Sequence, residues 1–182
     1  MTKYDSCNFD VNDEAECLEA VKRDGMNLRF IQNQTEALCL EAVKQNGRAL
    51  IYVKNQTEAI CLAAVKECGY ALQFVDQQTP EICMTGVKRD GFALFHVKNR
   101  TYEICKAAVQ ENGYALMGVK DQTLDICLAG VKQNGRALQF VKDQTFEVCM
   151  EAVKQDPFAI EHIYNQEMKE RVAEANGESL EY

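Results

Sequence analysis

Residues 34–55 read Gln34-Thr-Glu-Ala-Leu-Cys-Leu-Glu-Ala-Val-Lys-Gln-Asn-Gly-Arg-Ala-Leu-Ile-Tyr-Val-Lys-Asn55, and this pattern recurs every 22 residues without insertion or deletion. A fixed period of this size is typical of repeat proteins, in which each unit buries its apolar face against its neighbours. We therefore expect one elongated array of units rather than a globule with a single central core.

Four positions of the repeat form columns that hardly change along the chain. They hold threonine at Thr35, Thr57, Thr79, Thr101, Thr123 and Thr145, cysteine at Cys17, Cys39, Cys61, Cys83, Cys105, Cys127 and Cys149, valine at Val21, Val43, Val65, Val87, Val109, Val131 and Val153, and glycine at Gly25, Gly47, Gly69, Gly91, Gly113 and Gly135. Pro157 closes the glycine column. The predicted organisation is an N-terminal cap at 1–12, a seven-repeat solenoid at 13–166, and a C-terminal capping helix and tail at 167–182. The seven units are 13–34, 35–56, 57–78, 79–100, 101–122, 123–144 and 145–166.

The first half of each unit predicts an α-helix. Threonine, or Asp13 in the first unit, is an N-cap residue whose side-chain oxygen accepts a free backbone N–H. In the unit that begins at Thr57, apolar residues follow at offsets of 3, 4, 7 and 8, which define one helical face. The glycine, here Gly69, is predicted to end the helix in the left-handed conformation.

The second half of each unit is short and has two interpretations. Ala71, Leu72 and Val75 recur in almost every unit, and their spacing favours a short helix that turns back on the first. The alternative is a strand in a leucine-rich-repeat-like α/β horseshoe, whose period of about 20–29 residues also admits this repeat. We favour an all-α class, an α-solenoid of helical hairpins, and keep the horseshoe as the alternative.

One helical column contains only alanine and glycine. Its members are Ala20, Ala42, Ala64, Gly86, Ala108, Gly130 and Ala152. A small residue in every unit predicts close approach between stacked elements, so a larger side chain at Ala64 should overpack the contact.

The formal net charge of −8 is concentrated at the two ends of the chain. Residues 1–20 contain one basic and six acidic side chains, and residues 161–182 contain two basic and six acidic ones, so the body between them is nearly balanced. A balanced body lacks the positive field that nucleic-acid binding requires, and we expect no direct nucleic-acid partner. There is no apolar run of membrane-spanning length and no apolar signal core after Met1, so we expect a cytoplasmic protein without a membrane partner.

Seven of the nine cysteines occupy one column of the repeat, which predicts small buried side chains rather than a disulfide framework. Equivalent atoms of stacked helices lie about 8–10 Å apart, whereas the Cα atoms of a disulfide lie within about 7 Å. Cys7 and Cys68 lie outside the column and are the expected exposed thiols.

Units 57–78, 101–122 and 123–144 together supply the signature Glu-Ile-Cys-Leu-Ala-Ala-Val-Lys-Gln-Asn-Gly-Tyr-Ala-Leu-Gln-Phe-Val. This signature resembles the short α-helical repeats of a family of unknown function found in large DNA viruses and intracellular bacteria. The resemblance covers about residues 13–166, and the Ala-Val-Lys-Gln-Asn-Gly core carries it. It implies helical hairpins, no established activity, and an origin in a virus, a mobile element or a bacterium that manipulates a host. It supplies no catalytic residues.

No set of residues in the sequence specifies a reaction. His96 and His162 replace an aromatic residue of the packing column, and no Cys-x-x-Cys pair or clustered zinc spacing is present. The glycines are single and do not form a phosphate-binding loop. We therefore expect no enzyme activity, no metal and no cofactor.

The positions that vary between units are the candidate binding surface. The residue after each glycine and the residue three positions later include tyrosine, phenylalanine, methionine and arginine, which are enriched at interface cores. The predicted partner-binding residues are Arg48, Tyr70, Phe92, Phe95, Tyr114, Met117 and Arg136. Alternatively, the residue after the glycine packs over the end of the helix as a capping contact.

Three hypotheses of function follow from these features. The first is a non-enzymatic repeat protein that binds another protein, such as a host or defence factor, through an exposed ribbon of aromatic and arginine side chains. The second is an acidic inhibitor that imitates nucleic acid and occupies the site of a nucleic-acid-binding protein, as the low pI suggests. The third is self-assembly, although the charged ends favour a monomer or weak self-association.

Overall fold

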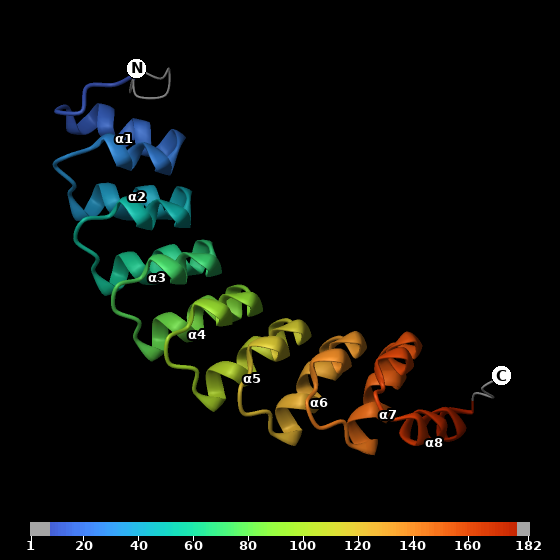
Figure 1. Ribbon diagram of the computed structural model, residues 1–182. Coiled ribbons are helices and arrows are strands. Elements are labelled where there is room, and N and C mark those ends of the chain that lie inside the picture. Colours follow the sequence, from blue (N-terminus) through green and yellow to red (C-terminus); the bar gives the residue numbers. More distant parts are fainter. Residues whose placement is uncertain (1–7, 178–182) are drawn as a thin grey trace, which may run out of the picture. The chain divides into compact units, whose positions relative to one another are not determined.

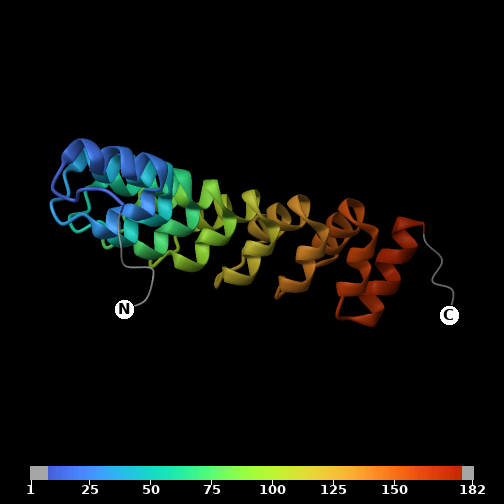
Figure 2. The same ribbon diagram turned by 90° about the horizontal axis from the view of Figure 1, so that it is seen from above.

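The computed structural model describes residues 8–177, in which helices are present and strands are absent (Figure 1). The chain divides into two compact units, Met1–Arg89 and Asp90–Tyr182. Within each unit, α-helices alternate with short 3₁₀-helices, and each helix packs against its counterpart in the next repeat, as Figure 2 also shows. The predicted all-α solenoid is confirmed, and the horseshoe alternative is wrong for the described residues.

The second half of each repeat is therefore a helix, as favoured, but a 3₁₀-helix of six residues. The α-helices are α1 Glu14–Arg23, α2 Glu36–Gln45, α3 Glu58–Glu67, α4 Pro80–Arg89, α5 Tyr102–Glu111, α6 Leu124–Gln133, α7 Phe146–Gln155 and α8 Gln166–Asn176. The 3₁₀-helices are η1 Gly25–Phe30, η2 Gly47–Tyr52, η3 Gly69–Phe74, η4 Gly91–His96, η5 Gly113–Gly118, η6 Gly135–Phe140 and η7 Pro157–His162.

The threonine column caps the α-helices as the sequence predicts. The Thr35 hydroxyl oxygen accepts the Leu38 N–H at 3.3 Å, and Asp13 accepts the Glu16 N–H at 3.0 Å in the first repeat. Thr123 is an exception, because it makes no side-chain cap bond at the start of α6. Its hydroxyl donates instead to a carboxylate oxygen of Asp125 at 2.5 Å.

One asparagine or aspartate joins the two helices of every hairpin except the third, where Cys68 stands at this position and makes no side-chain cap bond. The Asn46 N–H donates to the Ala42 carbonyl at 2.9 Å and ends α2, while the Asn46 side chain accepts the Arg48 N–H at 3.0 Å and begins η2. The backbone of this residue is extended, with φ −151° and ψ 106°. The chain therefore reverses direction at an extended residue, and this makes a left-handed glycine unnecessary.

The prediction that the column glycines are left-handed helix ends is wrong. Each of them is the first residue of a 3₁₀-helix, and among the described residues only Gly177 has a positive φ, of 77°. These glycines are required by close approach instead. A Cβ on Gly47 would overlap the main-chain carbonyl oxygen of Ala64, and one on Gly113 would overlap that of Gly130, in each case in the next repeat.

Pro157 supports this explanation of the glycine column. The six column glycines are buried, whereas Pro157 is exposed in the last repeat. Beyond it lies α8, a single helix that packs mainly on α7. A residue with a Cβ is tolerated where no further hairpin closes over the position.

The alanine and glycine column faces the leucine of the preceding 3₁₀-helix. Ala42, Ala64 and Ala108 have no exposed surface. A Cβ on Gly86 would press on the Leu72 side chain, and one on Gly130 would press on Leu116. The predicted close contact is present, and it joins the α-helix of one repeat to the 3₁₀-helix of the repeat before it.

In four repeats the last residue is a glutamine that bonds to the 3₁₀-helices on both sides of a junction. We call this contact the glutamine staple; it is formed by Gln34, Gln56, Gln122 and Gln144. The Gln122 side-chain amide donates to the Leu116 carbonyl of its own repeat at 3.1 Å and to the Phe140 carbonyl of the next at 2.9 Å. Its oxygen accepts the Lys142 N–H at 2.9 Å. The staple satisfies backbone groups at the end of each 3₁₀-helix that have no partner within that helix.

A second glutamine, at the end of the α-helix, bonds to the column glycine of the previous repeat. Gln45, Gln133 and Gln155 accept the N–H groups of Gly25, Gly113 and Gly135 at 2.6, 2.6 and 2.5 Å. Within the Val-Lys-Gln-Asn-Gly motif, the glutamine therefore bonds to the preceding repeat, and the glycine makes the close contact with the following repeat.

The cysteine column lies in the core, as predicted. All eight cysteines in the described residues are free thiols, and the seven of the column are buried. Cys68 is half-buried, and Cys7 lies outside the described residues.

The array ends on a helix with a polar outer side. Helix α8 buries Val172 and Ala173, begins at Asn165, whose side chain accepts the Met168 N–H at 2.8 Å, and ends at left-handed Gly177. The predicted tail beyond this glycine lies outside the described residues.

Candidate protein-binding surface

The seven predicted binding residues all lie on the 3₁₀-helices, at the second and fifth residues of the six. Because a 3₁₀-helix has three residues per turn, these two positions share one side of the helix. We call the set of side chains at these two positions the 3₁₀ strip. Arg48 and Tyr70 belong to the first unit. Phe92, Phe95, Tyr114, Met117 and Arg136 belong to the second unit.

In the second unit the strip begins with a pair of aromatic rings. The Phe92 and Phe95 ring centroids are 6.0 Å apart, with 26° between the ring planes. The Phe95 ring lies against Gly118, whose position holds an aromatic side chain in most other repeats. Phe95 therefore occupies space that the glycine leaves open, and 38% of its surface is exposed.

The next rings of the strip come from two repeats. Tyr114 and Phe140 meet edge to face, with centroids 5.7 Å apart. Tyr114 is half-buried, so part of it has the packing role that the alternative interpretation assigned to this column. Met117 has no such role, because 56% of its surface is exposed.

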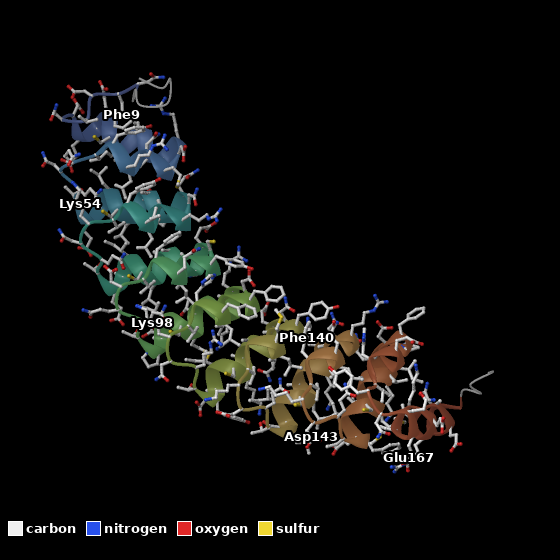
Figure 3. The ribbon with its side chains drawn as sticks, viewed as in Figure 1. Phe9, Lys54, Lys98, Phe140, Asp143 and Glu167 are labelled. Atoms are coloured by element: carbon white, nitrogen blue, oxygen red, sulfur yellow. The ribbon has the colours of Figure 1, made fainter. Side chains whose placement is uncertain are left out.

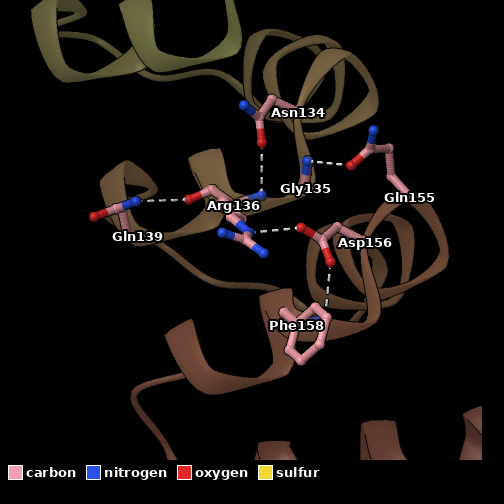
Figure 4. A network of polar contacts seen from close by, with 7 residues as sticks. All are labelled: Asn134, Gly135, Arg136, Gln139, Gln155, Asp156 and Phe158. Carbon is pink, nitrogen blue, oxygen red and sulfur yellow. Dashed lines mark hydrogen bonds and ion pairs between the residues drawn. The ribbon is translucent and has the colours of Figure 1, made fainter.

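Figure 4 shows the polar network at the C-terminal part of the strip. The Arg136 guanidinium donates to Asp156 at 2.7 Å and lies over the Phe158 ring, 5.5 Å from its centroid. The Arg136 hydrogen bond holds the pKa of the Asp156 carboxyl below its usual value, and the Phe158 N–H that donates to Asp156 acts in the same direction. Arg136 is thus fixed beside an aromatic ring that is 70% exposed.

In the first unit the strip is more mixed. Tyr70 is exposed, and its main-chain carbonyl accepts a bond from Gln73 at 3.1 Å. Arg48 is exposed, and Ile51, at the second strip position of the same helix, is more exposed than Tyr70.

The sequence reasoning placed Ile51 and Phe158 in the two columns of the strip but did not include them among the seven predicted binding residues, and both are exposed. It also missed a second column of large apolar side chains, at the first residue of α5, α6 and α7. These residues, Tyr102, Leu124 and Phe146, are all exposed.

A polar cluster surrounds the first residue of that second column. Lys106 lies 2.9 Å from Asp125 and 3.0 Å from the Tyr102 hydroxyl, and this hydroxyl also donates to Asp125. Hydrogen bonds from Thr123, Tyr102 and Lys106 hold the pKa of Asp125 well below its usual range. Hydrogen bonds of the Lys106 ammonium to Tyr102 and, next, to Asp125 raise the pKa of Lys106. Asp125 is therefore an ionised carboxylate whose charge is balanced by Lys106.

The described residues do not bring metal-binding side chains together. In residues 8–177 there is no group of three or more His, Cys, Asp and Glu side chains placed to hold a metal. Burial is the largest cause that raises the pKa of the Cys39, Cys61, Cys105 and Cys127 thiols, and it raises that of Cys149 to about 11. A protonated, buried thiol is a poor nucleophile.

The strip and the loops between repeats are separate surfaces. Figure 3 labels Phe140, whose ring contacts Tyr114 of the strip, and Asp143, in the loop before α7, on opposite sides of the ribbon of the second unit. None of the helices in the described part of the chain has the length and apolar character needed to cross a membrane.

A family model described as a domain of unknown function (DUF4116) matches the chain twice, at residues 35–79 and 123–169. The two matches together cover just over half of the chain. Neither the curated proteins nor the solved structures contain a significant match to this chain.

Proposed function

The chain belongs to the DUF4116 family of domains of unknown function, and from this premise we propose that it is a non-enzymatic repeat protein that binds another protein through the 3₁₀ strip. The observation that carries the proposal is the exposure of large apolar side chains at the two strip positions of η4, η5 and η7. Phe95, Met117 and Phe158 contribute such surface in the second unit.

These exposed side chains are not needed to fill the core of the repeat. The interior of each repeat is filled by other columns, such as Leu94, Leu116 and Leu138, which have no exposed surface. Clustered exposed apolar side chains cost solubility, and in soluble proteins they mark interaction sites. Aromatic, methionine and arginine side chains are the types that supply most of the binding energy at such sites.

The fixed geometry of the strip also favours binding. The 3₁₀-helices are held at both ends by hydrogen bonds, as at Asn134 and Arg136 (3.0 Å) and at Val141 and Leu138 (3.0 Å). A surface that is already ordered loses less conformational entropy when a partner docks. The viral or bacterial origin implied by the resemblance leads us to propose a host or defence protein as the partner.

The test is affinity capture with the tagged full-length chain, with bound proteins identified by mass spectrometry. In the triple variant Phe95→Ser/Met117→Ser/Phe158→Ser, the captured partner should be lost while the circular dichroism spectrum keeps its helical shape. Leu124→Ser is a matched control, because it removes an equally exposed apolar side chain outside the strip and should retain the partner. Capture that survives the triple variant would exclude the strip as the binding surface.

The acidic mimic of nucleic acid is a second candidate, supported by the acidic residues in the first turns of the α-helices, of which Glu81 is exposed. Others are engaged internally: Glu36 and Glu58 accept bonds from Thr57 and Thr79 at 3.0 and 3.1 Å, and Asp125 pairs with Lys106. Salt separates the two functions: binding by a mimic should weaken steeply as ionic strength rises, whereas binding through the apolar strip should change little.

A further inference from the structure

A cavity of about 190 Å³ lies on the loop edge of the second unit, between the N-terminal ends of α5 and α6. Its wall includes Arg100, Tyr102, Cys105, Lys120, Asp121 and Thr123. This edge is distinct from the 3₁₀ strip, so the inference does not depend on the proposed function.

Arg100 stands where other repeats have the glutamine of the staple. At those junctions the glutamine oxygen accepts a backbone N–H from the next repeat, at 3.0 Å from Lys54 and at 2.9 Å from Lys142. In four repeats the oxygen of the glutamine at this position also lies within 3.9 Å of a column thiol, at Cys39, Cys61, Cys83 and Cys127. The glutamine is thus both a donor and an acceptor at the junction.

Arg100 replaces the donor function of the glutamine but not its acceptor function. Its guanidinium donates to the Gly118 carbonyl at 2.8 Å, which corresponds to the bond from Gln122 to Phe140. It also donates to the carbonyls of Val97 at 3.3 Å and Phe95 at 3.2 Å. A guanidinium has five N–H groups and no acceptor, so two N–H groups remain after these three bonds.

Three further donors at this cavity have no acceptor in the described residues. The first is the Lys120 N–H, the counterpart of Lys142 N–H. The second is the Cys105 thiol, which is only 5% exposed. The third is the Ile126 N–H at the start of α6, because Thr123 does not cap that helix. Cys105 and Ile126 are buried, whereas Lys120 is an exposed residue. A buried donor without an acceptor is costly, and a positively polarised helix N-terminus favours an anion.

The charges around the cavity favour an anion over a cation. Arg100 and Lys120 oppose one carboxylate of the wall, Asp121, while nearby Asp125 is held by Lys106, Tyr102 and Thr123. The equivalent cavity of the first unit, about 330 Å³ in volume, has the opposite character. It is lined by Glu58 and Asp76, and its glutamine, Gln56, supplies the acceptor itself.

We propose that this cavity binds an oxyanion group, a carboxylate or a phosphate, which supplies the acceptor that Arg100 removed. One oxygen takes the place of the glutamine oxygen and accepts the Lys120 N–H. The other oxygens accept the remaining guanidinium N–H groups and the free N–H of α6. A planar or tetrahedral oxyanion of this kind is the usual partner of a guanidinium together with backbone N–H groups.

The test is a titration of the ¹⁵N-labelled full-length chain with sodium phosphate and, separately, with sodium acetate, at an ionic strength held constant with sodium chloride. The amide resonances of Lys120 and Ile126 should shift and saturate. The Lys142 amide, which is already bonded to Gln122, should not shift. Tighter binding of acetate identifies a carboxylate as the preferred group, and tighter binding of phosphate identifies a phosphoryl group.

The matched variant is Arg100→Gln, which restores the residue found at the neighbouring junctions and so preserves the fold. It should weaken binding about tenfold or more, because charge-assisted hydrogen bonds are lost and the glutamine oxygen occupies the site. Unchanged Lys142 and Cys127 amide resonances verify that the variant is folded. The proposal is overturned if the Lys120 amide does not respond to either anion, or if it responds equally in the wild type and in Arg100→Gln.

Discussion

The two units of the chain have the same buried columns, which pack one repeat on the next, but they expose different side chains at equivalent surface positions. At the first residue of the α-helices, the first unit has Glu14, Glu36, Glu58 and Pro80, whereas the second unit has Tyr102, Leu124 and Phe146. The 3₁₀ strip is likewise mixed in the first unit and rich in aromatic side chains in the second. Columns that touch the next repeat are constant, and columns that face outward vary. The surface can therefore change without cost to the stacking.

If the repeats pack in the same way in both units, substitution of a column glycine should cause the largest loss of stability, and the loss should be equal in the two units. We expect Gly47→Ala and Gly113→Ala each to lower the free energy of unfolding by about 3 kcal/mol, because the new methyl group overlaps a main-chain carbonyl that cannot move independently. Urea unfolding followed by circular dichroism measures this.

Pro157→Ala is the matched control for the glycine variants. Its position is exposed and already accommodates a Cβ, so the change in unfolding free energy should stay within about 1 kcal/mol. Equal losses at Gly113 and Pro157 would refute close approach as the reason for the glycine column.

The next effect concerns the small column of the α-helices. Ala64→Leu in the first unit and Ala108→Leu in the second should each cost about 2 kcal/mol, because both sites are fully buried against the preceding repeat. Thermal unfolding of both variants should show similar decreases in Tm. A variant that melts like the wild type would show that its unit has room at this contact and that the two units pack their repeats differently.

The smallest effect is a pH dependence confined to the second unit. Because the folded pKa of Asp156 lies below its unfolded value, the carboxylate adds stability above the unfolded pKa, and this is lost as the pH falls through the folded pKa. Arg136→Met should move the pKa of Asp156 back toward its ordinary value, as read from the carboxyl ¹³C shift during an acid titration. An unchanged titration curve would mean that Arg136 does not hold this carboxylate in solution.

The sequence was sufficient to predict the repeat period, the helical hairpins and the threonine caps, because these depend on local spacing and local hydrogen bonds. It was misleading for the glycines. A glycine after a helix is usually left-handed, and only the structure shows that Gly47 and Gly113 face a carbonyl of the next repeat. Such a contact between residues 17 apart depends on how repeats stack, which the local pattern does not contain.

The role of the glutamines was missed for the same physical reason. Gln122 directly precedes the cap residue Thr123, and the local sequence does not reveal its contacts, because its partners Phe140 and Lys142 are 18 and 20 residues away. For the 3₁₀ strip, the period predicted which columns could face outward, and five of the seven predicted residues are exposed. It could not predict that Phe92 and Tyr114 would be half-buried, because that depends on rings contributed by other positions, such as Phe95 and Phe140.

The central claim is that successive repeats are joined by side chains that bond the backbone of the neighbouring repeat, and amide hydrogen exchange tests it most directly. In the wild type the Lys142 amide, bonded to Gln122, should be protected, whereas the equivalent Lys120 amide, which faces Arg100, should exchange much faster in the absence of an oxyanion. Gln122→Ala should remove the protection of Lys142 while the amides within α6 stay protected. Equal protection of Lys120 and Lys142, or a Lys142 amide that is unaffected by Gln122→Ala, would contradict the account.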